Sequence, residues 1–471
     1  MPDKKTAAKK SEAELLKEKL CYDPKNAGVA LSDEEWEAAD LFCEGYKKFL
    51  DLAKTEREAV EITISMAREK GFTAFDPKKT YKAGDRVFLN NRGKALILCT
   101  IGKRPIAEGV RITAAHIDSP RLDLKPNPLY EEAQLALFKT HYYGGIKKYQ
   151  WTTIPLALHG VIVRADGEKI PVIVGEDEGD PVFCVTDLLP HLAAEQMSRK
   201  APDVVKGEAL NVLVGGRMFR DDKASERVKL AILKLLNEKY GVVEADFLSA
   251  ELTMVPAFHA CDVGFDRSFI GGYGHDDRVC AYPAVMAALH VADPAYTTVT
   301  VLADKEEIGS EGNTGLNSRY LVYFIEDLAA CFGEAGRHVL SKSKCLSADV
   351  NAAFDPTYGE VHEKNNAAYC NYGPAVTKYT GARGKSGTND ASAEFVGEVR
   401  RLLDADGVQW QTGELGKVDE GGGGTVAMFI SAYNVDVVDI GVPVLSMHAP
   451  FEIVAKSDVY QTYRAFVAFN K

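Results

Sequence analysis

The chain has 471 residues and a formal net charge of −12, with 46% hydrophobic and 26% charged residues. This composition is typical of a globular protein, and the length favours two domains over one. The negative charge argues against nucleic acid or an anionic membrane as the main partner, and the sequence has no apolar run of about 18 residues that would predict a membrane span.

The nine cysteines are scattered, and none forms a CxxC pair. An odd number of scattered thiols indicates reduced cysteines in a cytoplasmic protein, not a disulfide framework or a thiolate zinc site. The charged stretch Met1–Lys10 has no apolar core of the kind found in a signal peptide. We therefore expect a cytoplasmic protein in which any metal is held by histidines and carboxylates.

The first third of the chain predicts helices and then strands. Ser32 and Glu35 form a capping-box pattern, and the apolar spacing after them predicts a helix that continues to Lys70 and ends at Gly71. Apolar, β-branched runs then predict strands at 85–89, 94–100 and 109–116. The third strand ends at His116, and Asp118 lies two residues further on, so both can face one site.

The segment of residues 127–250, called the insert below, has a different pattern. A hairpin is predicted at 156–174 around Asp166-Gly167, and helices are predicted to begin near residue 188 and to span 223–240. The insert has few clustered acidic residues or histidines. We expect residues 1–126 and 251–471 to form a discontinuous α/β catalytic domain, and the insert to form a second, β-rich domain or an interface.

Acidic residues and histidines return after the insert, each at a strand end or a helix start. The most informative stretch is VTVLADKEEIGSEG (299–312), in which a buried-strand pattern changes abruptly to Glu306-Glu307. Active sites of open α/β sheets lie at such strand ends. One of these two glutamates can bind a metal while the other serves as a general base. The other residues of this kind are His116, Asp118, Asp276, Asp277, Asp349 and His448.

The two histidines, together with three of these carboxylates, suit a pair of divalent ions. The imidazoles favour zinc, with cobalt or manganese as alternatives. Two ions held about 3.5–4 Å apart need a bridging carboxylate. We assign the bridge to Asp276, which opens the loop before a buried helix, and keep Asp277 as the alternative.

Five blocks of the sequence together resemble the aspartyl aminopeptidase family of dinuclear zinc exopeptidases. They are TAAHIDSPRLDLKP (113–126), GHDDRVCA (274–281), DKEEIGSEG (304–312), SADVNAAFDP (347–356) and MHAPFEI (447–453). The resemblance implies a three-layer zinc-exopeptidase fold, with one ion held by His116, Asp276 and Asp349 and the other by Asp276, Glu307 and His448. It also implies that Glu306 is the general base and that Asp118 orients His116.

The same resemblance extends to substrate and assembly. The insert is similar to the family's dimerisation domain at YYGG (142–145) and LPHLA (189–193), which implies dimers assembled into a tetrahedral dodecamer that admits short peptides. Lys378 matches a position near an acidic substrate side chain, and His191 matches a residue that reaches a neighbouring subunit's site. The glycine-rich loop DEGGGG (419–424) departs from the family pattern.

The expected function is removal of N-terminal residues, Asp or Glu preferred, from short peptides by metal-assisted hydrolysis. Three alternatives stay open at this point. They are the same chemistry with a neutral, leucine-type preference, a related dinuclear hydrolase of acylated amino acids, and a non-catalytic shell protein that binds peptide or cargo.

Overall fold

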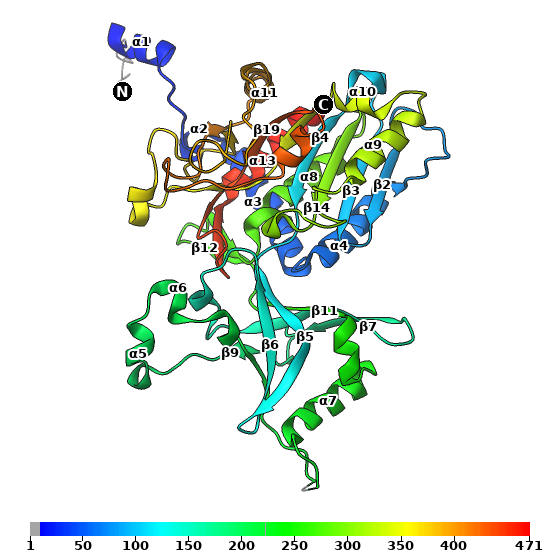
Figure 1. Ribbon diagram of the computed structural model, residues 1–471. Coiled ribbons are helices and arrows are strands. Elements are labelled where there is room, and N and C mark those ends of the chain that lie inside the picture. The colour runs from blue at the N-terminus through cyan, green and yellow to red at the C-terminus, as the bar shows by residue number, and fades with distance from the viewer. Residues whose placement is uncertain (1–9, 222) are drawn as a thin grey trace, which may run out of the picture.

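The computed structural model describes residues 10–221 and 223–471, and its upper part in Figure 1 is built on a nine-stranded sheet. The buried centre of the sheet consists of parallel strands flanked by antiparallel ones. In spatial order the strands are β1 (Thr73–Ala74), β2 (Arg86–Asn91), β3 (Ala95–Thr100), β14 (Thr298–Ala303), β4 (Arg111–His116), β15 (Lys344–Ser347), β19 (Asp436–Gly441), β17 (Ala375–Thr377) and β18 (Gln411–Thr412).

Helices cover both faces of this sheet, which gives three layers. The apolar core on one face includes residues of α3 (Asp33–Leu52), α4 (Glu56–Glu69), α8 (His275–His290), α11 (Ala393–Ala405) and α13 (Lys456–Asn470). The core on the other face includes residues of α9 (Tyr320–Ala330), α10 (Gly336–Leu340) and α12 (Ala427–Ser431). Such helix layers are what buried parallel strands require, and the predicted α/β class is confirmed.

The helix predicted from Ser32 to Lys70 is wrong as a single element, because the chain breaks between α3 and α4. Thr55 starts a second capping box with Glu58. Lys54 is buried at the break, where its ammonium donates to the carbonyl oxygens of Pro256 and Phe258 at 2.8 and 3.2 Å. The corner is therefore stabilised by tertiary contacts that helical periodicity does not encode.

A five-stranded sheet lies beside the main one. Its strands are β12 (Cys261–Val263), β13 (Phe269–Gly272), β21 (Glu452–Ala455), β20 (Pro443–Leu445) and β16 (Asn351–Ala352). Asp276 lies in the first turn of α8, just after β13, whereas Asp349 precedes β16 and His448 lies between β20 and β21. This sheet therefore brings three separate stretches of the chain to one place.

The insert forms most of a seven-stranded antiparallel sheet in the lower part of Figure 1. Its order is β8 (Lys169–Val174), β7 (Leu156–Val163), β11 (Ala250–Pro256), β5 (Arg121–Glu132), β6 (Leu135–Tyr143), β10 (Val212–Gly215) and β9 (Cys184–Val185). This sheet has its own apolar core around Trp151. Helix α7 (Arg227–Tyr240) packs on it and begins later than the predicted residue 223.

The remaining helices are short or peripheral. They are α1 (Glu12–Leu20), α2 (Ala27–Ala30), α5 (Ala194–Met197) and α6 (Ala201–Val204). Among the residues described, we find no helix with the length and apolar character needed to cross a membrane.

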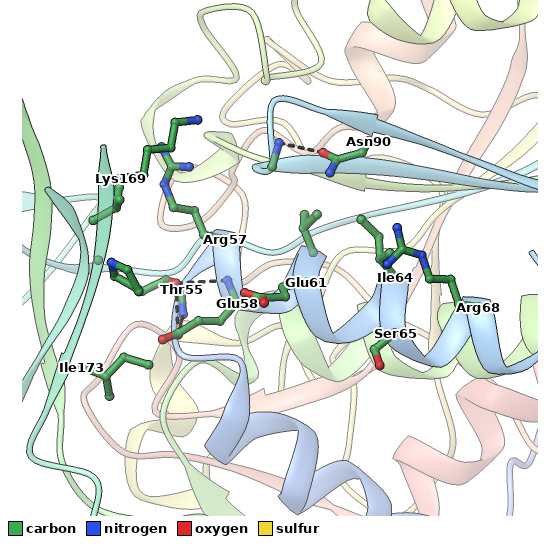
Figure 2. Close-up of a pocket in the computed structure, with 15 residues that line it drawn as sticks. Thr55, Arg57, Glu58, Glu61, Ile64, Ser65, Arg68, Asn90, Lys169 and Ile173 are labelled. Carbon is green, nitrogen blue, oxygen red and sulfur yellow. Dashed lines mark hydrogen bonds between the residues drawn. The ribbon is translucent and has the colours of Figure 1, made fainter. Parts of the chain in front are cut away.

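A cavity of about 660 Å³ marks the seam between α4 and the β7–β8 hairpin (Figure 2). Glu58 lies on its α4 side, and Lys169 and Ile173 lie on its hairpin side. At this seam His159 of β7 lies between two carboxylates, with Nδ1 2.7 Å from Glu58 and Nε2 2.8 Å from Glu176. These polar contacts connect the insert to α4.

Candidate metal centre

Three neighbouring parallel strands deliver the predicted site residues to one edge of the nine-stranded sheet. In the ladder Ala303 of β14 pairs with His116 of β4, and Ala114 of β4 pairs with Ser347 of β15. The residues just beyond these strand ends, including Glu306, Glu307 and Asp349, therefore lie at the same edge. Carboxyl ends of parallel strands are where α/β sheets place their ligands.

All five residues predicted to bind metal lie in two overlapping groups. The groups are His116, Asp276 and Asp349, and Asp276, Glu307 and His448, and within each group the candidate ligand atoms lie within 4.8 Å of one another.

Asp276 belongs to both groups, and its two oxygens face opposite sides. Oδ1 lies 3.1 Å from His116 Nε2, and Oδ2 lies 3.1 Å from His448 Nε2. Asp277 points elsewhere, because its Oδ2 accepts a hydrogen bond from the backbone N–H of His116 at 3.1 Å. These distances support Asp276 as the bridge, as the sequence hypothesis has it.

The side chains present fit divalent cations. The buried oxygen Glu307 Oε1 has no hydrogen-bond partner among the described residues, although such atoms are normally paired. Burial raises the pKa of Glu307 and Asp349 well above the usual range, and nearby carboxylates add to the shift, although His116 and His448 act in the opposite direction. A set of two imidazoles and three carboxylates is suited to zinc.

Asp118 lies next to His116 and to both glutamates, and its predicted role of orienting His116 stays a prediction. His116 Nδ1 lies 3.0 Å from the main-chain oxygen of Asp118 and 3.4 Å from its carboxylate. The carboxylate also accepts hydrogen bonds from the backbone N–H groups of Glu306 and Glu307, at 3.1 and 3.2 Å. Asp118 therefore connects the end of β4 to both glutamates.

Glu452 is a site residue that the sequence reasoning missed. It lies at the start of β21 and is fully buried, and its carboxylate accepts hydrogen bonds from the backbone N–H of Asp276 at 3.1 Å and of His448 at 2.7 Å. The MHAPFEI block contains Glu452, but a glutamate at the start of a strand carries no local signal for this contact. His448 itself has a φ of +66°, a conformation that costs a non-glycine residue energy and is enriched at functional sites.

The two adjacent glutamates have different surroundings. Glu307 is almost completely enclosed, and its Oε2 lies 3.5 Å from His448 Nε2. Glu306 is partly exposed, belongs to neither metal group and lines a cavity of about 680 Å³. Burial raises the pKa of Glu306 to about 7. An acceptor with a near-neutral pKa, beside open space and metal ligands, is suited to proton transfer.

The cavity beside Glu306 combines apolar walls with one guanidinium. Met428, Phe429 and Tyr433 line it, and Arg319 is a further lining residue. Gly424 and Thr425, at the end of the glycine-rich loop, also border it. The loop therefore lies at the edge of the space that a substrate can enter.

Lys378 and His191 are not part of the two metal groups. Lys378 follows β17, is half exposed, and has its ammonium 3.8 Å from Asp390 Oδ1. His191 is exposed in a 3-10 helix (Pro190–Leu192) of the insert. Their proposed substrate roles stay predictions.

Comparison with known proteins identifies relatives along nearly the whole chain. The family model described as aminopeptidase I zinc metalloprotease (M18) matches residues 49–470. A Clostridium acetobutylicum protein named probable M18 family aminopeptidase 1 is 49% identical over 458 residues, which cover 96% of this chain and 98% of that protein.

Solved structures agree. The crystal structure of an M18 aminopeptidase from Thermotoga maritima has a TM-score of 0.90 and 44% identity, covering 96% of this chain and 99% of that one. The structure of the S. cerevisiae mApe1 dodecamer has a TM-score of 0.73 at 19% identity, covering 92% and 97% of the two chains. At that identity the likeness shows the shared fold.

Proposed function

The chain belongs to the aminopeptidase I (M18) family of zinc metalloproteases, and from this premise we propose that it is a dinuclear zinc aminopeptidase that removes N-terminal residues, acidic ones preferred, from short peptides. The observation that carries the proposal is the sharing of Asp276 between two groups of candidate ligands next to Glu306. Family membership favours an aminopeptidase over a hydrolase of acylated amino acids, and the presence of all five candidate ligands together with Glu306 argues against a non-catalytic shell protein.

We assign one ion to His116, Asp276 and Asp349, and the other to Asp276, Glu307 and His448. When bound, the ions supply Lewis acidity to the substrate carbonyl and lower the pKa of water. In this proposal the free α-amine of a peptide binds within the acidic site, next to the ligand residues and Glu306. Recognition of this amine favours substrates with a free N-terminus and accounts for exopeptidase action.

Glu306 moves the proton in this proposal. Its carboxylate faces the cavity, and Oε2 lies 3.9 Å from His116 Nε2. It takes a proton from the attacking water and gives it to the leaving amine, as a base with a pKa near the working pH does efficiently. Asp118 holds the backbone of Glu306 in place, so that the carboxylate keeps its direction while the proton is transferred.

The preferred N-terminal side chain distinguishes two versions of the proposal. An acidic side chain in a protein of net charge −12 needs a local positive group, and Lys378 is our candidate. The neutral alternative is favoured by two observations: Met428, Phe429 and Tyr433 line the cavity, and Asp390 lies close to the Lys378 ammonium.

A substrate panel decides between these versions. We propose measuring kcat/KM for aspartyl, glutamyl and leucyl substrates in wild type, in Lys378→Met, and in the control Lys385→Met, since Lys385 also approaches Asp390. A hydrogen bond to a charged group contributes about 1.5–3 kcal/mol, so loss of Lys378 should lower acidic-substrate kcat/KM by about 10- to 150-fold. A leucyl preference in wild type that both variants keep would reject the acidic version.

Assembly is part of the same proposal. We propose that the insert forms dimers that build a tetrahedral dodecamer, so that short peptides enter and folded proteins do not. Exposed apolar side chains gather at Leu188, Leu189, Leu192 and Met197 of the insert, as expected at an interface. Light scattering on wild type and Leu192→Asp should show twelve chains and a smaller species, respectively. A wild-type monomer would reject the assembly.

A further inference from the structure

The insert contacts the metal centre through the three residues that follow one another at the end of β6, Tyr143, Gly144 and Gly145. The hydroxyl of Tyr143 donates a hydrogen bond to Asp118 Oδ2 at 2.8 Å. The carbonyl oxygen of Gly145 lies 2.7 Å from His448 Nδ1. Each of the two metal groups is therefore touched by one polar contact from the insert, directly at His448 or through Asp118.

We propose that Tyr143 and Gly145 are positioning residues for the metal centre, and that the insert stabilises bound metal through them. This inference rests on the proposed dinuclear site. The segment Tyr143–Gly145 is called the clamp.

The Gly145 contact determines which ring nitrogen of His448 carries the proton. A neutral imidazole carries its proton on one nitrogen only, and the carbonyl of Gly145 can only accept. In the neutral, metal-binding form of His448 the proton therefore resides on Nδ1, and the Nε2 lone pair is free. Nε2 is the atom that faces Asp276 Oδ2 at 3.1 Å and Glu307 Oε2 at 3.5 Å. Partners of this kind fix the ring and tautomer of metal-binding histidines.

The Tyr143 contact acts on Asp118, which lies next to His116 of the first metal group. Asp118 is fully buried, and besides Tyr143 its carboxylate accepts the backbone N–H groups of Glu306 and Glu307. The Tyr143 ring is itself held, because the Arg121 guanidinium lies over it at 4.1 Å. Losing the hydroxyl would leave a buried carboxylate oxygen with fewer donors and would loosen both glutamates.

Gly144 and Gly145 show how closely the clamp approaches Glu307 and His448. A Cβ on Gly144 would lie 3.1 Å from Glu307 Oε2 and 3.3 Å from Glu307 Cβ. A Cβ on Gly145 would lie 3.3 Å from His448 Nδ1. The φ of +74° is sufficient to explain a glycine at position 144. Gly145 has no positive φ, so its backbone conformation does not require a glycine. Its lack of a side chain is explained by contact with His448.

The clamp also gives the insert a role besides assembly. Tyr143 is the last residue of β6, which pairs with β5, and Gly145 lies in the loop that follows. A shift of this end of β6 would act on His448 and Asp118 together. We therefore expect metal retention to depend on the position of the insert.

The test compares Tyr143→Phe and Gly145→Ala with two matched controls. Tyr142→Phe removes a hydroxyl from the neighbouring residue, whose side chain is exposed, and Gly216→Ala adds a methyl group that meets only ordinary contact with Leu135 at 3.6 Å. The primary measurement is the rate at which zinc-loaded protein releases zinc to a chromogenic chelator. Outer contacts to metal ligands typically change metal affinity by about 10- to 100-fold. We expect release to accelerate by that factor in both clamp variants and to stay unchanged in both controls.

Two further readouts separate positioning from simple destabilisation. Zinc should raise the Tm of both clamp variants less than it raises the Tm of wild type, and Gly145→Ala should change the visible absorption of cobalt-loaded protein. Clamp variants that release zinc at the control rate would overturn the inference, and so would equal losses of Tm with and without zinc. If wild type binds zinc in this way but hydrolyses no peptide, the proposed function fails while the clamp stands.

Discussion

Replacing Glu306 by Gln tests the division of labour between the two adjacent glutamates. The substitution keeps the shape of the side chain and removes its ability to take a proton. Loss of a general base typically lowers turnover by about 10²- to 10⁴-fold, which corresponds to about 2.7–5.5 kcal/mol of barrier height. We expect kcat to fall within that range.

Metal binding should respond differently. Glu306 lies outside both ligand groups, and its Oε2 is 3.9 Å from His116 Nε2, beyond hydrogen-bond distance. Zinc affinity should therefore change by less than about tenfold, the lower end for directly bonded neighbours of a ligand. Glu307→Gln should instead lower zinc occupancy, because Glu307 is enclosed beside His448 and its charge helps to offset that of a cation.

The assay combines single-turnover kinetics with metal analysis of the purified protein. Glu311→Gln is the control, because Glu311 lines the same cavity and is exposed. Our reasoning is refuted if Glu306→Gln loses zinc while Glu307→Gln keeps it, since the two roles would then be reversed. Wild-type turnover in Glu306→Gln would show that Glu306 is not the general base.

Three further results are expected. Chelation should lower Tm and abolish activity. Zinc at about 100 times its Kd should restore about 2.7 kcal/mol of the free energy of unfolding, and a Tm that does not change with zinc would contradict this. Burial lowers the pKa of His159, but hydrogen bonds to Glu176 and Glu58 outweigh it and raise the pKa. The stabilisation that protonated His159 gives the folded state is therefore complete below about pH 6.5, the pKa of a histidine in the unfolded chain. It disappears as the pH rises through the higher pKa of His159 in the folded state. His159→Gln should cost about 3–5 kcal/mol at pH 5 and less at pH 9, and a pH-independent loss of Tm would count against it. Phe466 is a buried residue of α13, and Phe466→Ala should lower the free energy of unfolding by about 3–5 kcal/mol. Phe265 is fully exposed, so Phe265→Ala should leave Tm within a degree or so.

The site residues were accessible from the sequence because they follow the rule of parallel strand ends. His116 ends an apolar run, Glu306 and Asp349 follow apolar runs within three residues, and the sheet order β14-β4-β15 places those strand ends side by side. Asp276 and His448 lie next to strands of a second sheet, and the sequence pattern singled them out as residues at a helix start and at a strand end. The register that brings all five together is a tertiary property.

Other features leave no local signal. The break at Lys54 depends on carbonyl groups about 200 residues away in the chain, so a continuous amphipathic pattern predicted one helix. Tyr143 and Gly145 read as part of an interface-like segment, yet they contact Asp118 and His448. The hydrogen bonds of Glu452 to two backbone N–H groups are equally non-local. Composition and periodicity describe one segment at a time, whereas these contacts join segments.

Anomalous diffraction at the zinc edge from zinc-loaded crystals tests the central claim most directly. We predict two zinc peaks about 3.5–4 Å apart. One should be bound by His116 and Asp349, the other by Glu307 and His448, with Asp276 between them. A single peak, or a pair bridged by Asp277, would contradict the account.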